Sequence, residues 1–147
     1  MKRTKILVLC TQNSCRSQMA EGLIRQGYGD RVEVFSAGSK PAEQVHPFAV
    51  EALKRRGIDI SSHVPKSVMK FMDESFDIII TTCDSARATC PFFPGNAEHI
   101  HWDIQDPTSA EGDPEEILAA FEKTADLLES YIAGLDEKIE AINKSGD

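Results

Sequence analysis

Two short apolar segments constrain the fold of this chain most strongly. Residues 5–9 (KILVL) and 76–82 (FDIIITT) are apolar and rich in β-branched side chains. Such runs are typical of strands buried on both faces, which occur in parallel sheets covered by helices. The first run is shorter than the roughly 7–15 residues of a secretory signal core, so we interpret it as the first strand.

Helical patterns alternate with strand patterns along the rest of the sequence. Apolar residues at steps of three and four predict helices over residues 17–27, 47–56 and 114–142, and a short one over 67–72. Gly134 is a weak point inside the last helix, because glycine lowers helix propensity. Weaker strand patterns occupy residues 32–36, ended by Ala37 and Gly38, and residues 98–102.

Alternating strands and helices imply a parallel sheet joined by right-handed crossovers. We therefore predict a single α/β domain over residues 1–147, with a four-stranded parallel sheet and helices on both faces. Residues 83–96 contain Pro91, Pro94 and Gly95, which predicts a loop with room for one helical turn. Residues 144–147 are expected to form a frayed tail.

The composition excludes several classes of partner. The 147 residues include 16 Lys and Arg and 24 Asp and Glu, a net charge of −8, with no basic run that would attract nucleic acid or an anionic membrane. No stretch approaches the roughly 18 apolar residues of a membrane span. We expect a cytoplasmic protein that works as a monomer, and in a reducing cytosol its four cysteines are not permanent disulfides.

Reactive side chains follow three of the predicted strands. Cys10 ends the first, Cys83 follows the strand at 76–82, and Asp103 and Asp106 follow the strand at 98–102. In parallel sheets the carboxyl ends of the strands meet at one edge, where ligands bind. The sequence therefore predicts one site that contains these groups.

The segment CTQNSCRS places a cysteine, five residues and an arginine between a buried strand and a helix. A loop at a helix N-terminus directs backbone N–H groups at an anion, and its positive field favours a thiolate at Cys10. Arg16 offers a planar fork to two oxygens of a tetrahedral anion. We predict an oxyanion-binding loop that consists, after Cys10, of Thr11, Gln12, Asn13, Ser14, Cys15, Arg16 and Ser17.

Within this loop the side chains are expected to differ in role. Asn13 and Ser17 are placed to hold the loop or to bond the sulfur, whereas Cys15 is expected to pack. A structural interpretation of the same spacing makes Cys10 a buried strand-end residue and Arg16 a surface helix cap. The strand before the loop and the helix after it favour the oxyanion site.

Three segments carry a resemblance to a known family. CTQNSCRSQMAEG at residues 10–22, FSAG at 35–38 and HWDIQDP at 101–107 resemble the low-molecular-weight tyrosine phosphatases, and among them the thioredoxin-coupled arsenate reductases. The likeness runs from about Lys5 into the last helix. It implies the strand order 2-1-3-4.

The resemblance also implies a mechanism. Cys10 would attack arsenate held by the loop and Arg16, while Asp106, before Pro107, protonates the departing oxygen. Cys83 and Cys90 would carry the resulting disulfide outward, and reduced thioredoxin would reduce it. No bound cofactor is implied.

Alternatives exist for most of these groups. Asp103 is the second candidate for the acid, and Cys83 and Cys90 can instead be unrelated loop residues. A zinc site is disfavoured, because there is no Cys-x2-Cys pair and the histidines show no ligand spacing with the thiols, so we expect no metal. Trp102 and Phe92–Phe93 are candidates for a thioredoxin docking patch or for core packing.

The sequence departs from the family pattern at two positions. Gln12 stands where many relatives carry glycine, so a need for a positive φ at that position predicts either strain at Gln12 or a slightly different arrangement of the loop. Some reductases of the group bind potassium through residues that match Asn13, Glu21 and Ser36, plus an aspartate that is replaced here by Lys66. We hypothesise that the ammonium group neutralises Glu21 and holds Asn13, so that activity is independent of potassium; an ordinary surface role for Lys66 is the alternative.

Three functions stay open from the sequence. An arsenate reductase needs the second and third thiols, because reducing As(V) to As(III) consumes two electrons. A phosphatase needs only Cys10, because water resolves its phosphocysteine. A module that binds oxyanions without turnover is the third, and the presence of Arg16 and Asp106 argues against it.

Overall fold

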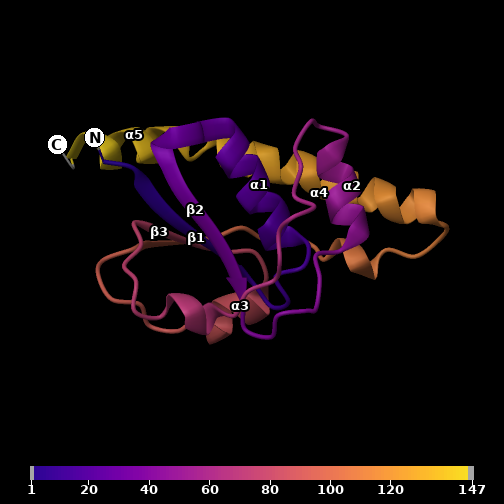
Figure 1. Cartoon of the computed structure of the whole chain (residues 1–147), viewed down its shortest axis with the longest axis horizontal. Coiled ribbons are helices and arrows are strands. Elements are labelled where there is room, and N and C mark those ends of the chain that lie inside the picture. Colours follow the sequence, from indigo (N-terminus) through magenta and orange to yellow (C-terminus); the bar gives the residue numbers. More distant parts are fainter. Residues whose placement is uncertain (1, 146–147) are drawn as a thin grey trace.

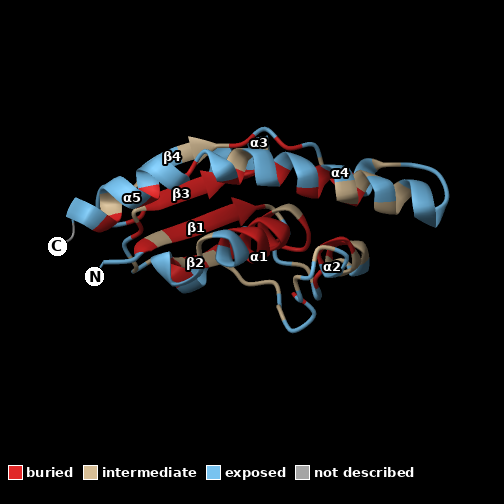
Figure 2. Ribbon diagram, turned by 90° about the horizontal axis from the view of Figure 1, so that it is seen from above, coloured by how far each residue is buried: buried red, intermediate tan, exposed pale blue. Residues whose placement is uncertain are grey.

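The computed structural model describes residues 2–145. Its sheet consists of four parallel strands in the order β2-β1-β3-β4, as expected. The strands are β1 (Thr4–Cys10), β2 (Val32–Gly38), β3 (Ile78–Thr81) and β4 (Glu98–His101). Figure 2 shows β1 and β3 as the buried centre of the molecule, which explains their apolar runs.

The helices follow the predicted order with two differences (Figure 1). They are α1 (Arg16–Tyr28), α2 (Pro47–Lys54), α3 (Asp84–Thr89), α4 (Pro114–Ala133) and α5 (Asp136–Ser145). Short 3-10 turns are η1 (Gly29–Arg31), η2 (Val68–Phe71) and η3 (Pro107–Ser109).

The first difference lies after residue 114, where the predicted single helix is two helices. It breaks at Gly134, which caps α4, and α5 continues to Ser145. Lys144 and Ser145 are therefore helical rather than frayed, and residues 146–147 of the predicted tail lie outside the described residues. The second difference is α3, a six-residue helix within the predicted loop.

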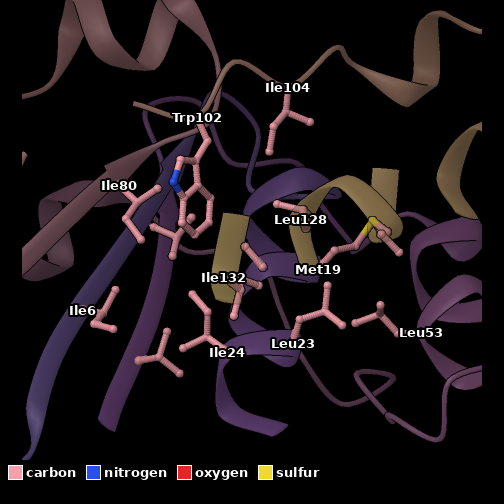
Figure 3. Close-up of a cluster of buried hydrophobic side chains, with 14 of the residues drawn as sticks. Ile6, Met19, Leu23, Ile24, Leu53, Ile80, Trp102, Ile104, Leu128 and Ile132 are labelled. Atoms are coloured by element: carbon pink, nitrogen blue, oxygen red, sulfur yellow. The ribbon is translucent and has the colours of Figure 1, made fainter. Parts of the chain in front are cut away.

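One face of the sheet carries the larger core. Alternate residues of the central strands, such as Ile6 and Ile80, point to this face and pack with side chains of α1, α4 and α5. Figure 3 shows Met19, Leu23 and Ile132 within this cluster. Burial of these apolar side chains fixes the helices on the sheet, and thereby the loop between β1 and α1.

The opposite face carries a smaller core. Leu7, Leu9 and Ile79 point to it and pack with η2 and with Ala86 of α3. Helices thus cover both faces, as predicted. Because α3 is held by one buried alanine, it is attached to the sheet by little apolar surface.

Within residues 2–145, no helix combines the length and apolar character that a membrane crossing requires.

Candidate active site

The carboxyl edge of the sheet brings the predicted groups together. In the strand register Cys10 lies opposite Gly38 of β2, and Leu9 lies opposite Thr81 of β3. The loop after β1 leads directly into α1, so residues 10–16 lie at the N-terminus of that helix. Cys83 and Asp106 also contact this loop, as the parallel topology predicts, whereas Asp103 lies at the same edge beside Asp84 and His101.

The sulfur of Cys10 sits among hydrogen-bond donors. Asn13 donates its backbone N–H to Cys10 Sγ at 3.2 Å, and Ser17 Oγ lies 2.8 Å from the same sulfur. Because Ser17 Oγ accepts a hydrogen bond from Asn13 Nδ2 at 2.7 Å, its own proton is free to point at the sulfur. Both contacts stabilise negative charge on Cys10.

The strained residue of the loop is Asn13 rather than Gln12. Among described residues other than glycine, only Asn13 has a positive φ, 52°, so the strain expected at Gln12 is absent. Asparagine tolerates this left-handed region better than most residues. Its Oδ1 accepts hydrogen bonds from Gln18 Nε2 at 3.0 Å and from the Lys66 backbone at 2.9 Å, which hold the conformation.

Gly38 is a site residue that the sequence reasoning treated only as a strand end. A Cβ at this position would lie 2.4 Å from Thr11 O and 2.9 Å from Cys10 O, so no other residue fits without moving the loop. β2 also continues through Ala37 and Gly38 instead of ending before them. The FSAG segment, which ends in Gly38 and resembles the family pattern, was the feature of the sequence that could have indicated this role.

The segment after β2 is fastened to the loop by backbone hydrogen bonds. Lys40 N–H donates to Thr11 O, and Ala42 N–H donates to Gln12 O, both at 2.9 Å. His46 N–H donates to Ser14 O at 2.8 Å. These three hydrogen bonds use carbonyl groups of the loop and none of its N–H groups, which are the groups that bind an anion.

Arg16 is fixed at one end and has an unused donor. Its Nη1 donates to Ile104 O at 3.1 Å, and its Nη2 lies 3.7 Å from Asp106 Oδ2. Its Nε is buried without a hydrogen-bond partner among the described residues. A largely buried guanidinium with an unmet donor beside an anion loop is suited to binding an oxyanion.

Asp106 is the candidate acid that lies at the loop. It caps the start of η3, where its Oδ1 accepts hydrogen bonds from Thr108 N at 2.9 Å and Thr108 Oγ1 at 2.7 Å. Its side chain is 43% exposed, which allows exchange of a proton with solvent. Asp103 is exposed and has its carboxylate near Asp84 and His101 instead.

Cys15 differs from Cys10 in its surroundings. Burial, and then the negative charges of Cys10 and Asp106, raise the pKa of the Cys15 thiol to about 11. It packs in the larger core and points its Sγ toward Asp106 Oδ1 at 4.0 Å. A protonated, packed thiol agrees with the expected non-nucleophilic role.

Cys83 and Cys90 flank α3 beside the loop. Cys83 Sγ lies 3.5 Å from Thr11 Oγ1 and accepts the Ala86 N–H at 3.3 Å as the helix cap. Cys90 caps the other end of α3, and it lines, together with Cys10, a small cavity of about 20 Å³. Burial raises the pKa of the Cys90 thiol. All three thiols of the predicted relay therefore lie around one loop.

The aromatic residues of the predicted docking patch divide between core and surface. Trp102 is buried and stacks on Tyr131 with ring centroids 5.4 Å apart, and Phe93 is buried in the smaller core. Phe92, next to the Cys90–Pro91 pair, is 89% exposed. Only Phe92 is available for docking.

The residues that match a potassium site do not suit a cation here. Ser36 Oγ donates to Glu21 Oε1 at 2.6 Å, and Lys66 Nζ lies 3.9 Å from the same oxygen. An ammonium group repels a cation and cannot coordinate it. Asn13 is held by the backbone N–H of Lys66 rather than by its ammonium group, contrary to our expectation.

Sheet order, loop placement and the Cys10–Arg16 pair define a class of α/β proteins with a phosphatase-like oxyanion loop. The sequence matches the description of the low-molecular-weight phosphotyrosine protein phosphatases over residues 5–145, and the chain belongs to this family.

Similar proteins include both reductases and phosphatases. An arsenate reductase of Halalkalibacterium halodurans is 43% identical over 126 residues, 86% of this chain and 90% of the relative. A thioredoxin-dependent arsenate reductase of Corynebacterium glutamicum superposes with a TM-score of 0.74 at 29% identity, over 95% of this chain and 63% of that chain. A low-molecular-weight protein tyrosine phosphatase of T. tengcongensis gives a TM-score of 0.74 at 32% identity, over 92% and 99%.

Proposed function

We propose that this protein is an arsenate reductase that uses a relay of three cysteines and reduced thioredoxin as its electron donor. The observation that carries the proposal is the meeting of three thiols at one oxyanion loop. Cys83 contacts Thr11 of the loop, and Cys90 shares a cavity with Cys10. The similar arsenate reductases support it.

The first step is attack of the Cys10 thiolate on arsenic of arsenate held by loop N–H groups and Arg16. An As–O bond breaks, Asp106 gives its proton to the departing oxygen, and water leaves. The hydrogen bonds from Ser17 and Asn13 that favour the thiolate prepare Cys10 for this attack. The product is a sulfur–arsenic(V) adduct.

The second step transfers two electrons to arsenic. Cys83 attacks Cys10 Sγ, so that a disulfide forms, the S–As bond breaks and its electron pair leaves with arsenic as arsenite. The contact of Cys83 Sγ with Thr11 Oγ1 of the loop, at 3.5 Å, supports this step. Cys90 then attacks Cys83, which releases Cys10 as a thiolate and leaves a Cys83–Cys90 disulfide.

Formation of the Cys83–Cys90 disulfide requires α3 to change shape. Cys83 and Cys90 are seven positions apart, so a helical segment at 1.5 Å per residue holds their Cα atoms about 10 Å apart. A disulfide needs Cα atoms within about 7 Å. The helix from Asp84 to Thr89 buries one residue, Ala86, so it can unwind at low cost. The segment that must move is thus weakly held.

Thioredoxin would reduce the Cys83–Cys90 disulfide by thiol exchange at the surface. This cycle requires a pool of reduced thiols, which agrees with the cytoplasmic location expected from the sequence.

The main experiment measures arsenate-dependent NADPH consumption with thioredoxin and thioredoxin reductase. We expect turnover by the wild-type protein and its loss in Cys83→Ser and Cys90→Ser. Hydrolysis of an aryl phosphate serves as the internal control, because it tests the loop without the relay. Both variants should retain it.

A second candidate function is hydrolysis of phosphate monoesters. The family match and the similar T. tengcongensis phosphatase favour it, since the loop, Arg16 and Asp106 suit either reaction. Aryl phosphate hydrolysis without any arsenate-dependent NADPH consumption would establish the phosphatase and reject the reductase. Undiminished arsenate turnover in Cys90→Ser would reject the cysteine relay but not the reductase activity.

A further inference from the structure

A second group of polar side chains lies at the same sheet edge, outside the oxyanion loop. Asp84 begins α3, His101 ends β4, and Asp103 follows two residues later. Their ligand atoms all lie within 4.8 Å of one another. The sheet register explains the meeting, because His101 pairs with Thr81, three residues before Asp84.

His101 is the best-defined member of this group. Its Nδ1 lies 2.7 Å from Thr81 Oγ1 in a hydrogen bond that fixes the ring, and its side chain is only 16% exposed. Its Nε2 is buried and has no hydrogen-bond partner among the described residues. A buried ring nitrogen without a partner calls for an explanation.

The nearby carboxylate does not supply one. Asp84 Oδ1 lies 3.3 Å from His101 Nε2, within ion-pair distance, but the two atoms do not form a hydrogen bond. When two ligand atoms each lie about 2.1 Å from one metal ion and the ligand–metal–ligand angle is about 90–110°, the two atoms lie roughly 3.0–3.4 Å apart. Each then points at the ion rather than at the other ligand atom. The observed separation matches that of two ligands of one metal ion.

We propose that Asp84, His101 and Asp103 form a binding site for a divalent transition-metal ion. One imidazole and two carboxylates suit Co²⁺, Zn²⁺ or Mn²⁺ better than Ca²⁺ or Mg²⁺, which prefer oxygen ligands throughout. Thr81 provides the outer contact that a ligating histidine usually has on its other nitrogen. Solvent completes the coordination, because both carboxylates are exposed.

One neighbouring charge opposes the ion. Arg87 Nη2 lies 3.8 Å from the same Asp84 oxygen, one turn along α3. The guanidinium competes with a metal for Asp84 and repels it. Removing the charge of Arg87 should therefore strengthen metal binding. Loss of His101 should weaken it, whereas metal binding by loosely placed acidic groups alone would not depend on His101.

The ion would join α3 to the sheet. Asp84 belongs to α3, and His101 and Asp103 belong to β4 and the segment after it. Binding should therefore slow hydrogen exchange of the α3 amides, an effect that does not depend on which reaction the protein catalyses.

The test is titration of the full chain with Co²⁺ under reducing conditions, followed by calorimetry and by visible absorption. We expect one saturable site whose spectrum lacks sulfur-to-cobalt charge-transfer bands. His101→Gln and Asp103→Asn should weaken binding at least about tenfold, Thr81→Val about 10–100-fold, and Arg87→Gln should strengthen it. His99→Gln, at the exposed histidine two residues before His101, is the matched control and should bind as the wild type does.

Several results would overturn the proposal. They are the absence of saturable binding, equal binding by the wild type and His101→Gln, and a spectrum dominated by sulfur ligation. Equal weakening by His99→Gln would also reject it, since it would show non-specific histidine binding. Circular dichroism of each variant confirms that a loss of binding is not a loss of fold.

Discussion

At the scale of single residues, Gly38 shows how a missing side chain shapes the site. Gly38→Ala would place a Cβ 2.4 Å from Thr11 O, a backbone atom that cannot swing away. The loop must shift, so we expect a loss of about 1–3 kcal/mol of unfolding free energy and a large fall in catalytic turnover. Urea unfolding and aryl phosphate hydrolysis measure the two effects.

Gly27→Ala is the matched control for this substitution. Gly27 lies inside α1, and a Cβ there would meet nothing within 4 Å. Alanine favours a helix over glycine, so this variant should gain about 0.5–1 kcal/mol and keep its activity. If both variants were stabilised, close approach of the loop to Gly38 would be the wrong explanation.

Lys66 carries a second prediction at the residue scale. Its ammonium group lies 3.9 Å from Oε1 of the buried Glu21 and supplies a positive charge beside this carboxylate. We expect turnover and the thermal midpoint to be the same in potassium and in tetramethylammonium salts at equal ionic strength. A large gain in either quantity with potassium would reject this interpretation. Lys66→Ala should lower the thermal midpoint, because Glu21 loses a compensating charge.

At the scale of elements, the start of α4 depends on a capping box. Asp113 accepts the Glu116 backbone N–H at 2.9 Å, and the Glu116 side chain accepts the Asp113 N–H at 3.3 Å. Asp113→Ala should therefore cost about 0.5–2 kcal/mol in urea unfolding. Asp113→Ser keeps an acceptor at the cap and should retain most of the stability; an equal loss in both would point to charge rather than capping.

The elements also show how far sequence patterns reach. β1 and β3 were predictable because burial on both faces demands continuous apolar runs. The helix α3 was predictable only as one turn within a loop, because it has one buried residue and no periodic apolar face. The break at Gly134 was visible only as a weak point, since apolar spacing continues across it into α5.

The candidate site also contains features that the sequence predicts and features that it does not. Cys10 and Arg16 belong to one local segment, so their spacing shows their relation directly. The positive φ of Asn13 and the closeness of Gly38 to Thr11 depend on contacts between distant segments. A sequence pattern contains no such contact, so the comparison with glycine in relatives directed attention to Gln12 rather than to Asn13.

At the scale of the whole molecule, two histidines link stability to pH. Burial lowers the pKa of His63 from 6.5; Arg25 and Lys66 act in the same direction, and Glu21 and Asp59 oppose it. Burial likewise lowers the pKa of His46, opposed by Asp106. Both side chains therefore bind a proton less readily in the folded protein than in the unfolded chain.

This difference sets the sign of the pH effect. About one unit or more above pH 6.5 both states are neutral at these histidines, and their contribution to stability is complete. As pH falls below 6.5 toward the lowered pKa values, the unfolded chain gains protons first, so the free energy of unfolding decreases. We expect the urea midpoint to fall between pH 7.5 and pH 5.5, before most carboxylates titrate.

Two substitutions test this origin of the pH dependence. His63→Gln removes one titrating group, and His46→Asn removes the other while keeping an acceptor for the Phe48 N–H that caps α2. Each variant should show a shallower fall of the urea midpoint, and the double variant the shallowest, because fewer groups take up protons on unfolding. If the urea midpoint of the double variant fell with pH as steeply as that of the wild type, other groups would be responsible for the pH effect. This conclusion does not depend on the stability of the variant at pH 7.5.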